Sequence, residues 1–357
     1  MFKNSFGSVF RITTFGESHG FGIGVVIDGC PAGLNIEEEE ICEYLSLRAP
    51  GKKFTSSRKE PDRVKILSGV FEGKTTAAPI CLLISNEDVV SHDYEKVKNV
   101  LRPEHANATY MMKYGYFDYR GGGRASGRET AARVAASFIA KKLLAIYGIK
   151  SIAYLKALGN ITLKNVSLSV DILLKKRNKS EIFTVDENIE KLMIRRLKNL
   201  QKTKDTIGSI VGFLAEIPKN LGEPVFEKLP AKIGSLMLSI PGAKGFEIDD
   251  GFMAAKKKGS SRNSGWRYEN HRLITQSSTL GGISTGQPLM GTVAFKPPST
   301  IGKKQKSVDF ARKEKEFAVS DVSRHDVTIG IRGAIVVEAC LNLALLDLFL
   351  LNRLARI

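Results

Sequence analysis

The C-terminal stretch of the chain, residues 333–357, places the strongest constraint on the fold. It reads GAIVVEACLNLALLDLFLLNRLARI, an apolar run long enough to cross a bilayer as a helix. Glu338, Asn342, Asp347 and Asn352 interrupt it every four or five residues, and charges at such positions are costly in lipid. We therefore expect a helix buried in a globular core, which a chain of 357 residues is long enough to build.

The chain is strongly basic, with 54 Lys and Arg against 37 Asp and Glu and a formal net charge of +17. Such an excess attracts either nucleic acid or a small polyanion. A nucleic-acid-binding protein would present aromatic side chains on a basic face, but aromatic residues make up only 8% here, with one Trp. A small anionic ligand therefore fits better, and we expect neither a nucleic-acid partner nor a membrane.

The four cysteines, Cys30, Cys42, Cys81 and Cys340, are far apart and form no CxxC pair. With only five histidines in the chain, a zinc site or a disulfide framework is not expected. The first ten residues lack the apolar segment of a secretory signal. These features predict a cytoplasmic protein without a bound metal.

Hydrophobic periodicity and turn residues predict a mixture of strands and helices. We expect helices at 36–47 and 129–147, strands at 63–70 and 78–85, a Lys-rich helical insertion with a solvated face at about 162–205, and a strand-rich block at 207–252. Asn35 and Glu38 have the spacing of a capping box for the first helix. No Walker A motif occurs, and no GxGxxG lies between a strand and a helix, so the pattern favours α+β or α/β layers.

Two passages share a weak pattern in which an apolar strand leads into Pro, Gly and Leu. They are VVIDGCPAGL at 25–34 and FLAEIPKNLGEPVF at 213–226. A duplicated unit would explain the match, although a single short similarity is slight support.

Five short motifs carry side chains suited to acid–base chemistry or anion binding. They are GESHG at 16–20, RPEH at 102–105, GGGRASGRET at 121–130, KPPSTI at 296–301 and SRHD at 323–326. Glycines beside His19 leave its imidazole accessible, and three glycines before a helix N-terminus expose N–H groups near Arg124 and Arg128. Each motif alone is also compatible with an ordinary turn or a surface histidine.

Taken in order and spacing, these motifs resemble the signature regions of chorismate synthases. RPEHANATYMMKYG at 102–115, GGGRASGRETAARVAA at 121–136 and SRHDV at 323–327 extend the likeness, and LSGVFEGKTT and GGISTGQP occupy intervening positions. The resemblance implies an α+β subunit, a β-α-β sandwich with helices packed against antiparallel sheets, formed by residues 1–357 as a single domain. It also implies a cytoplasmic homotetramer.

The resemblance further implies conversion of 5-enolpyruvylshikimate 3-phosphate to chorismate by an anti-1,4-elimination that needs reduced FMN without net redox change. Whether NADPH reduces the flavin on this chain is left open. An ordinary flavin oxidoreductase is the competing enzyme class, which would consume reductant as product forms. The phosphates and carboxylates of substrate and FMN would account for part of the positive charge.

Roles for individual residues come from the same resemblance. The catalytic residues would be His19, His105, Asp326, Ser18 and Ser126. The FMN-binding residues would be Arg124, Ala125, Ser126, Gly242, Gly281, Lys296, Pro297, Pro298, Ser299, Thr300 and Arg324, and the substrate-binding residues would be Arg48, Arg102 and Arg128. The chain departs from the family pattern at Leu47, Ala49, Asn107, Ala125, Gly127 and Pro241–Gly242, and these changes place single contacts in doubt.

Overall fold

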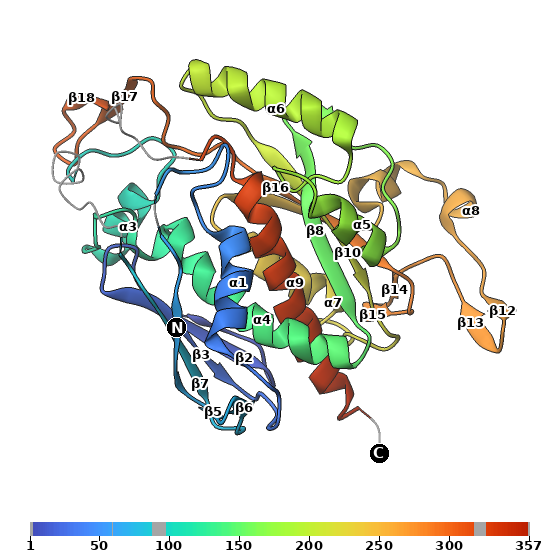
Figure 1. Cartoon of the computed structure of the whole chain (residues 1–357). Helices are drawn as coiled ribbons and strands as arrows, with labels where there is room; N and C mark the ends of the chain where they lie inside the picture. The colour runs from blue at the N-terminus through green and yellow to red at the C-terminus, as the bar shows by residue number, and fades with distance from the viewer. Residues whose placement is uncertain (1–2, 59, 88–97, 318–325, 356–357) are drawn as a thin grey trace.

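Two five-stranded antiparallel sheets form the outer layers of the protein, and helices fill the space between them (Figure 1). The structure, a computed structural model, describes residues 3–58, 60–87, 98–317 and 326–355. The first sheet has the strand order β1 (Ser5–Phe6), β2 (Arg11–Gly16), β3 (Gly22–Asp28), β7 (Ile80–Ser85) and β4 (Val64–Ser68). The second has the order β11 (Ala243–Ile248), β16 (Leu289–Phe295), β10 (Ser209–Glu216), β8 (Lys150–Leu158) and β9 (Ile161–Thr162).

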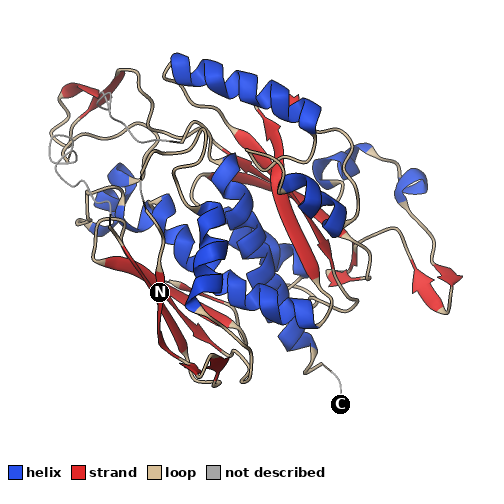
Figure 2. Ribbon diagram, in the orientation of Figure 1, coloured by secondary structure: helices blue, strands red, loops and turns tan. Residues whose placement is uncertain are grey.

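The central layer consists of α1 (Glu38–Arg48), α4 (Thr130–Ile146), α7 (Leu229–Leu238) and α9 (Gly330–Asn352). Helix α4 packs on β3 and β7 of the first sheet, α9 packs on β8 and β10 of the second, and the two helices contact each other. Figure 2 shows these helices between two groups of strands. The predicted α+β sandwich with helices against antiparallel sheets is confirmed.

The remaining elements are short or lie outside this sandwich. The helices are α3 (Asn107–Tyr114), α5 (Val170–Arg177), α6 (Glu187–Lys202) and α8 (Gly259–Arg262), with 3-10 turns η1 (Gly123–Ala125), η2 (Gly127–Glu129) and η3 (Gly251–Lys256). The hairpins are β5 (Val70–Phe71) with β6 (Lys74–Thr75), β12 (Arg267–Glu269) with β13 (Arg272–Ile274), β14 (Thr279–Leu280) with β15 (Ile283–Ser284), and β17 (Gln305–Val308) with β18 (Glu314–Phe317).

The two halves of the chain repeat one topology. Each half runs strand, strand, helix, strand, strand, helix: β2-β3-α1-β4-β7-α4 in the first and β8-β10-α7-β11-β16-α9 in the second. In both sheets these four strands lie in the spatial order first, second, fourth, third. The similar passages at 25–34 and 213–226 both run from the second strand toward its following helix, so the topology agrees with a duplicated unit.

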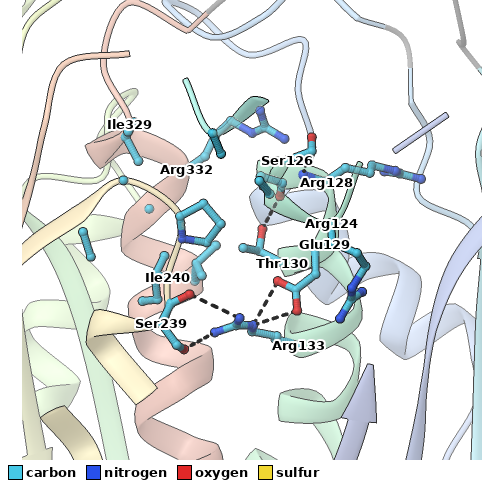
Figure 3. Close-up of a pocket in the computed structure, with 18 of the residues that line it drawn as sticks. Arg124, Ser126, Arg128, Glu129, Thr130, Arg133, Ser239, Ile240, Ile329 and Arg332 are labelled. Atoms are coloured by element: carbon cyan, nitrogen blue, oxygen red, sulfur yellow. Dashed lines mark hydrogen bonds and ion pairs between the residues drawn. The ribbon is translucent and has the colours of Figure 1, made fainter. Parts of the chain in front are cut away.

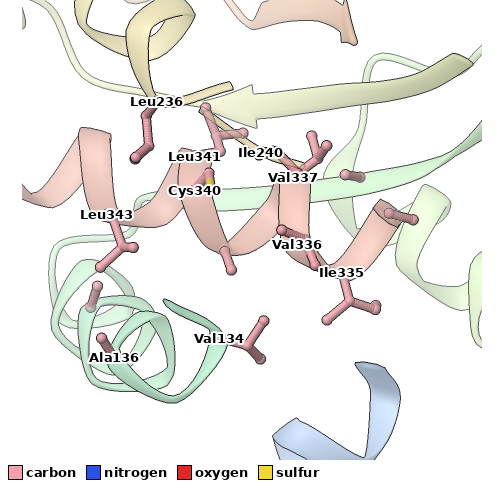
Figure 4. Close-up of a cluster of buried hydrophobic side chains, with 14 of the residues drawn as sticks. Val134, Ala136, Leu236, Ile240, Ile335, Val336, Val337, Cys340, Leu341 and Leu343 are labelled. Carbon is pink, nitrogen blue, oxygen red and sulfur yellow. The ribbon is translucent and has the colours of Figure 1, made fainter. Parts of the chain in front are cut away.

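Helix α9 is buried from Gly330 to Leu348 except at Arg332, as its apolar sequence predicted. Although long and apolar enough for a membrane span, it has 83% of its most apolar window buried inside the protein. Figure 4 shows its side chains against Val134 of α4 and Leu236 of α7. Its polar residues have interior partners: the Asp347 carboxylate accepts N–H bonds from Ser8, Val9 and Phe10.

Three predictions about the elements need correction. Helix α1 begins at Glu38, and its capping box joins Glu37 to Glu40, because Asn35 is held in a β-bridge to Lys74. The block at 207–252 contains helix α7, whose apolar Leu229–Leu238 segment packs on α9 and β11.

The third correction concerns the insertion at about 162–205. It does form helices: α5 packs on β8 and β10, and α6 packs beside the edge strand β9 (Figure 1). Its charges are not all solvated, since Arg177 is only 2% exposed and pairs with the buried Glu338 of α9. The pair compensates both charges in the core, as buried ions require.

Candidate active site

A cavity of about 920 Å³ lies where the N-termini of α4 and α9 meet (Figure 3). Its other walls come from the end of α1, the end of α7 with the turn into β11, and the loop after β16. Both central helices therefore direct the positive ends of their dipoles toward the cavity. Ligand sites are typically about 300–1,000 Å³, so the volume of this cavity is that of a large ligand pocket.

The cavity wall is cationic. Among the described residues, nine basic side chains line it: Lys3, Arg48, Arg58, Arg102, Arg124, Arg128, Arg133, Lys296 and Arg332. Four carboxylates line it as well: Glu60, Glu104, Glu129 and Asp326. Together with the helix dipoles, this imbalance suits ligands with several negative charges.

The glycine loop before η1 separates two of the predicted catalytic histidines. Gly121, Gly122 and Gly123 all have positive φ, of 61°, 108° and 53°. A Cβ on Gly121 would lie 2.4 Å from Nε2 of His19, and one on Gly122 would lie 3.1 Å from Nε2 of His105. Only glycine fits these positions, because it tolerates the left-handed backbone and leaves room for both rings.

The surroundings hold both histidines neutral at pH 7. Burial, with Arg58 nearby, lowers the pKa of His19 to about 4. Burial and the charges of Arg102 and Lys296 lower the pKa of His105 to about 3. Each shift disfavours the imidazolium, so a proton on either ring needs an added negative charge beside it.

Asp326 is held at both carboxylate oxygens at the start of α9. Its Oδ1 accepts the backbone N–H of Ser56 at 2.7 Å, and its Oδ2 accepts from Nη1 of Arg332 at 3.1 Å. Nε of Arg332 donates to the carbonyl oxygen of Arg48 at 2.8 Å. The carboxylate is therefore fixed at the cavity wall by Ser56 and by Arg332 of α9, which also contacts the end of α1.

Arg48 and Arg128 share one buried carboxylate. Nη1 of Arg48 lies 2.9 Å from Oδ2 of Asp62, and Nη1 of Arg128 donates to Oδ1 of the same side chain. Arg48 also donates to Thr130 Oγ1 and to the carbonyl oxygen of Gly127, which tie it to the start of α4.

Three other cations of the wall are anchored to neighbouring chain segments. Nη2 of Arg124 donates to Thr14 Oγ1 at 2.8 Å, and Nη2 of Arg102 donates to Thr300 Oγ1 at 3.1 Å. Lys296 donates to the carbonyl oxygen of Glu104, which joins the loop after β16 to the RPEH motif. These contacts join the RPEH motif to the KPPSTI motif and tie the glycine-rich motif to β2.

Most predicted site residues line this cavity. They are His105, Asp326, Ser126, Arg124, Ala125, Gly242, Lys296, Pro298, Ser299, Thr300, Arg48, Arg102 and Arg128. Ser18 and His19 lie behind Gly121, whose backbone lines the cavity, and Pro297 is next to lining residues. Arg324 lies outside the described residues.

Gly281 is placed elsewhere. It lies in the turn of the β14–β15 hairpin, where the Gly282 carbonyl accepts the N–H of Leu229 at the start of α7. The cavity is at the other end of that helix, at Leu238 and Ser239. A ten-residue helix is about 15 Å long, so Gly281 is roughly that far from the cavity of its own subunit.

Several residues that build the site were not predicted from the sequence. Asp62, Glu129, Arg133, Arg58 and Arg332 either line the cavity or hold a side chain that does. Arg332 carried a usable signal, because an arginine in the first turn of an otherwise apolar helix needs a partner. Asp62 is in the Glu-Pro-Asp turn before β4, and no feature of the sequence distinguishes this turn from an ordinary surface turn. Among the described residues, no group of three His, Cys, Asp or Glu could hold a metal ion.

Comparison with known proteins agrees with this geometry. The family model described as chorismate synthase matches residues 10–350. The chorismate synthase of Protochlamydia amoebophila is 45% identical over 368 residues, covering 100% of both chains, and that of Sulfolobus acidocaldarius is 45% identical over 359 residues, covering 96% of this chain and 89% of the relative. The chain belongs to the chorismate synthase family.

A solved structure supports the same assignment for the fold. The crystal structure of a chorismate synthase matches with a TM-score of 0.76 and 27% identity, covering 96% of this chain and 92% of the other. The chain is thus a lyase of aromatic biosynthesis that converts 5-enolpyruvylshikimate 3-phosphate to chorismate, with loss of phosphate and a proton.

Proposed function

We propose that the cavity at the N-termini of α4 and α9 is the active site, and that it holds the substrate beside reduced FMN. The cationic wall is the observation that supports this most directly, since the substrate carries one phosphate and two carboxylates and FMN carries a further phosphate. The volume of about 920 Å³ is near the upper end of the range for ligand pockets.

The residues present fit the flavin. Arg124, Ser126, Lys296, Ser299 and Thr300 supply donors for a phosphate or for polar ring atoms around one part of the cavity. Behind Gly121, the buried Oγ of Ser18 has no hydrogen-bond partner among the described residues. When bound, reduced FMN supplies an electron-rich ring that stabilises electron deficiency in the substrate as phosphate departs.

His105 is the proposed proton donor to the leaving phosphate. Arg102 and Lys296, the two cations that depress its pKa, are also the nearest candidates for binding the phosphate. A phosphate dianion bound between them opposes their effect and favours the imidazolium. The histidine thus gains its proton when the substrate is in place.

Asp326 is the proposed proton acceptor on the other side of the reaction. Ser56 and Arg332 keep it in one orientation at the wall, which a base must have before proton transfer. Ser18, His19 and Ser126 are proposed to support proton movement near the glycine loop, and Arg48, Arg102 and Arg128 to bind the substrate anions. Arg324 is proposed to contact FMN on the strength of the resemblance.

We also propose a homotetramer formed from single-domain subunits in the cytoplasm. Large apolar side chains are exposed in the described part of this subunit, including Phe226 at 89%, Phe252 at 77% and Trp266 at 55%, and subunit contacts would cover them. In such an assembly Gly281 would contact FMN from a neighbouring subunit. We propose NADPH as the reductant of FMN when no external source of reduced flavin is present.

A flavin titration tests the assignment of the cavity. Protein should quench FMN fluorescence, and Lys296→Gln should weaken FMN binding about 10-fold, the scale of one charge-assisted contact. Lys303→Gln, in the same loop but paired with Asp205, is the control and should bind as the wild type does. Equal affinity in Lys296→Gln and the wild type would remove Lys296 from the flavin site.

A further inference from the structure

Asp62 lies behind the cavity wall, between two of the arginines that form it. Its side chain is 0% exposed, and its two oxygens are divided between the guanidinium groups, with Oδ2 bound to Arg48 and Oδ1 to Arg128. Arg48 ends α1 and Arg128 lies in η2, so Asp62 connects two segments that are 80 residues apart in sequence.

The arrangement compensates a strong repulsion. Two guanidinium ions that share a buried site repel each other far more than in water. Arg332 adds a third positive charge nearby, and burial together with Arg332 and Arg128 lowers the pKa of Arg48 to about 9, while Asp62 acts to raise it. Glu60, 3.6 Å from Nη2 of Arg128, adds a second carboxylate beside that arginine.

The remaining donors of both arginines are also largely committed. Nε of Arg128 donates to Asn86 Oδ1 at 2.9 Å, and its Nη2 donates to the carbonyl oxygen of Ser85 at 3.1 Å. Each guanidinium is therefore fixed in orientation as well as position. A rigid pair of cations binds an anion with little loss of side-chain entropy.

We propose that Asp62 is a positioning residue for the substrate: it holds Arg48 and Arg128 side by side so that their cavity-facing edges bind the anionic groups of 5-enolpyruvylshikimate 3-phosphate. The inference rests on the proposed substrate role of the two arginines. It assigns to Asp62 a function in binding, although Asp62 is not among the residues that line the cavity.

For replacement of Asp62, a positioning role and a purely electrostatic effect predict opposite changes in substrate affinity. Removing a negative charge behind an anion site should tighten substrate binding if only the net charge matters. If Asp62 acts by position, its replacement should weaken binding, because the two guanidinium groups move apart. Asp62 has a φ of 49°, and Asn tolerates that backbone as well as Asp does, so Asp62→Asn isolates the side chain.

The experiment compares Asp62→Asn and Asp62→Glu with the wild type, measuring KM, kcat and the calorimetric dissociation constant of 5-enolpyruvylshikimate 3-phosphate. We expect a 10- to 100-fold rise in KM and in the dissociation constant, about the loss of one charge-assisted contact, with a much smaller change in kcat. Asp62→Glu retains the charge but misplaces it, so its KM and dissociation constant should change in the same direction.

Glu338→Gln is the matched control. Glu338 is also a buried carboxylate shared by two cations, Lys141 and Arg177, and it does not line the cavity in the part of the chain described. It should lower the melting temperature and leave KM unchanged. The proposal would be overturned if the Asp62 variants lost thermal stability with KM unchanged, as expected for Glu338→Gln, or if they bound substrate more tightly. It would also be overturned if neither Asp62 variant folded.

Arg128→Gln separates this inference from the proposed function. If Arg128→Gln raises KM and Asp62→Glu does not, the substrate role of Arg128 stands and the role of Asp62 is wrong. If Arg128→Gln leaves KM unchanged, the arginine does not bind substrate and both proposals fall. The double variant Arg128→Gln, Asp62→Asn gives a further test. If Asp62 acts through Arg128, the fold-increase in KM of the double variant should be smaller than the product of the two single-variant fold-increases.

Discussion

The protonation of His105 depends on what lies next to it. Burial and the charges of Arg102 and Lys296 lower the pKa of His105, so the ring is neutral in this structure. The ring therefore does not carry the proton before a negatively charged ligand binds beside it. In the proposed mechanism the same two cations bind the phosphate, and its negative charge favours the protonated ring. Proton donation would thereby be coupled to substrate binding.

This coupling predicts a shift that can be measured on one ring. In isotope-labelled protein, the His105 resonance, assigned by its loss in His105→Asn, should titrate well below the ordinary histidine pKa of about 6.5. With saturating substrate and no flavin, the pKa should rise by a unit or more, since a phosphate charge stabilises the imidazolium. A His105 pKa that is normal without substrate would contradict the described electrostatics. A His105 pKa that substrate does not change would exclude this histidine as the proton donor to the phosphate.

Asp326 permits a second test at the residue scale. Asp326→Asn keeps the shape and the hydrogen bond from Ser56 but removes the proton acceptor. We expect kcat to fall by about 100- to 10,000-fold, the scale of a lost acid–base group, with KM changed much less. The anaerobic assay should contain saturating reduced FMN; wild-type kcat under those conditions would reduce Asp326 to a structural partner of Arg332.

At the scale of elements, the glycine loop before η1 keeps His19 and His105 apart. Gly121→Ala should lower kcat by more than 10-fold, because its Cβ would overlap the His19 ring and the left-handed backbone would be strained. Gly148→Ala is the control: its φ of 70° carries the same backbone strain, but nothing lies within 4 Å of its Cβ. Both variants should lose some thermal stability, and a kcat equally low in Gly148→Ala would show that strain alone explains the loss.

The elements that could be predicted from sequence are those with a strong local pattern. Helix α9 and helix α4 follow from their apolar residues, and the helices of the insertion follow from its composition. Helix α7 was missed, since its start at Leu229 and Pro230 follows a Pro- and Gly-rich passage typical of loops. Arg177 was misread because its partner, Glu338, is 161 residues away and no local pattern shows it.

In the candidate site, too, the residues that could be predicted are those in a local sequence motif. His105, Asp326 and Lys296 were found because they stand in motifs that match a family. Asp62 and Arg133 act through side chains brought together by folding, Asp62 with Arg48 and Arg128, and Arg133 with Glu129. The family resemblance also led to Gly281, which lies in the β14–β15 turn away from the cavity of this subunit.

At the scale of the whole molecule, the buried histidines make stability depend on pH. His19 and His105 have pKa values of about 4 and about 3 in the folded protein, below the value of about 6.5 expected for the unfolded chain. The unfolded state therefore binds protons first as pH falls, so their contribution is complete above about pH 6.5 and is lost toward pH 4 and 3.

The corresponding measurement is the melting temperature between pH 7.5 and 5, above the range in which most carboxylates titrate. It should decrease as the pH falls, and a His19→Asn, His105→Asn double variant should show a flatter dependence. A wild-type melting temperature that is constant over this range, or a double variant with the same slope, would show that these rings are not buried neutral.

The central claim is that this cavity carries out the family's elimination with a flavin that is needed but not consumed. The direct measurement is an anaerobic assay with the protein, chemically reduced FMN and excess 5-enolpyruvylshikimate 3-phosphate, following chorismate, phosphate and the flavin spectrum together. We predict many equivalents of chorismate and phosphate per flavin, with the FMN still reduced at the end. No chorismate, or one reduced flavin consumed for each product formed, would contradict the account.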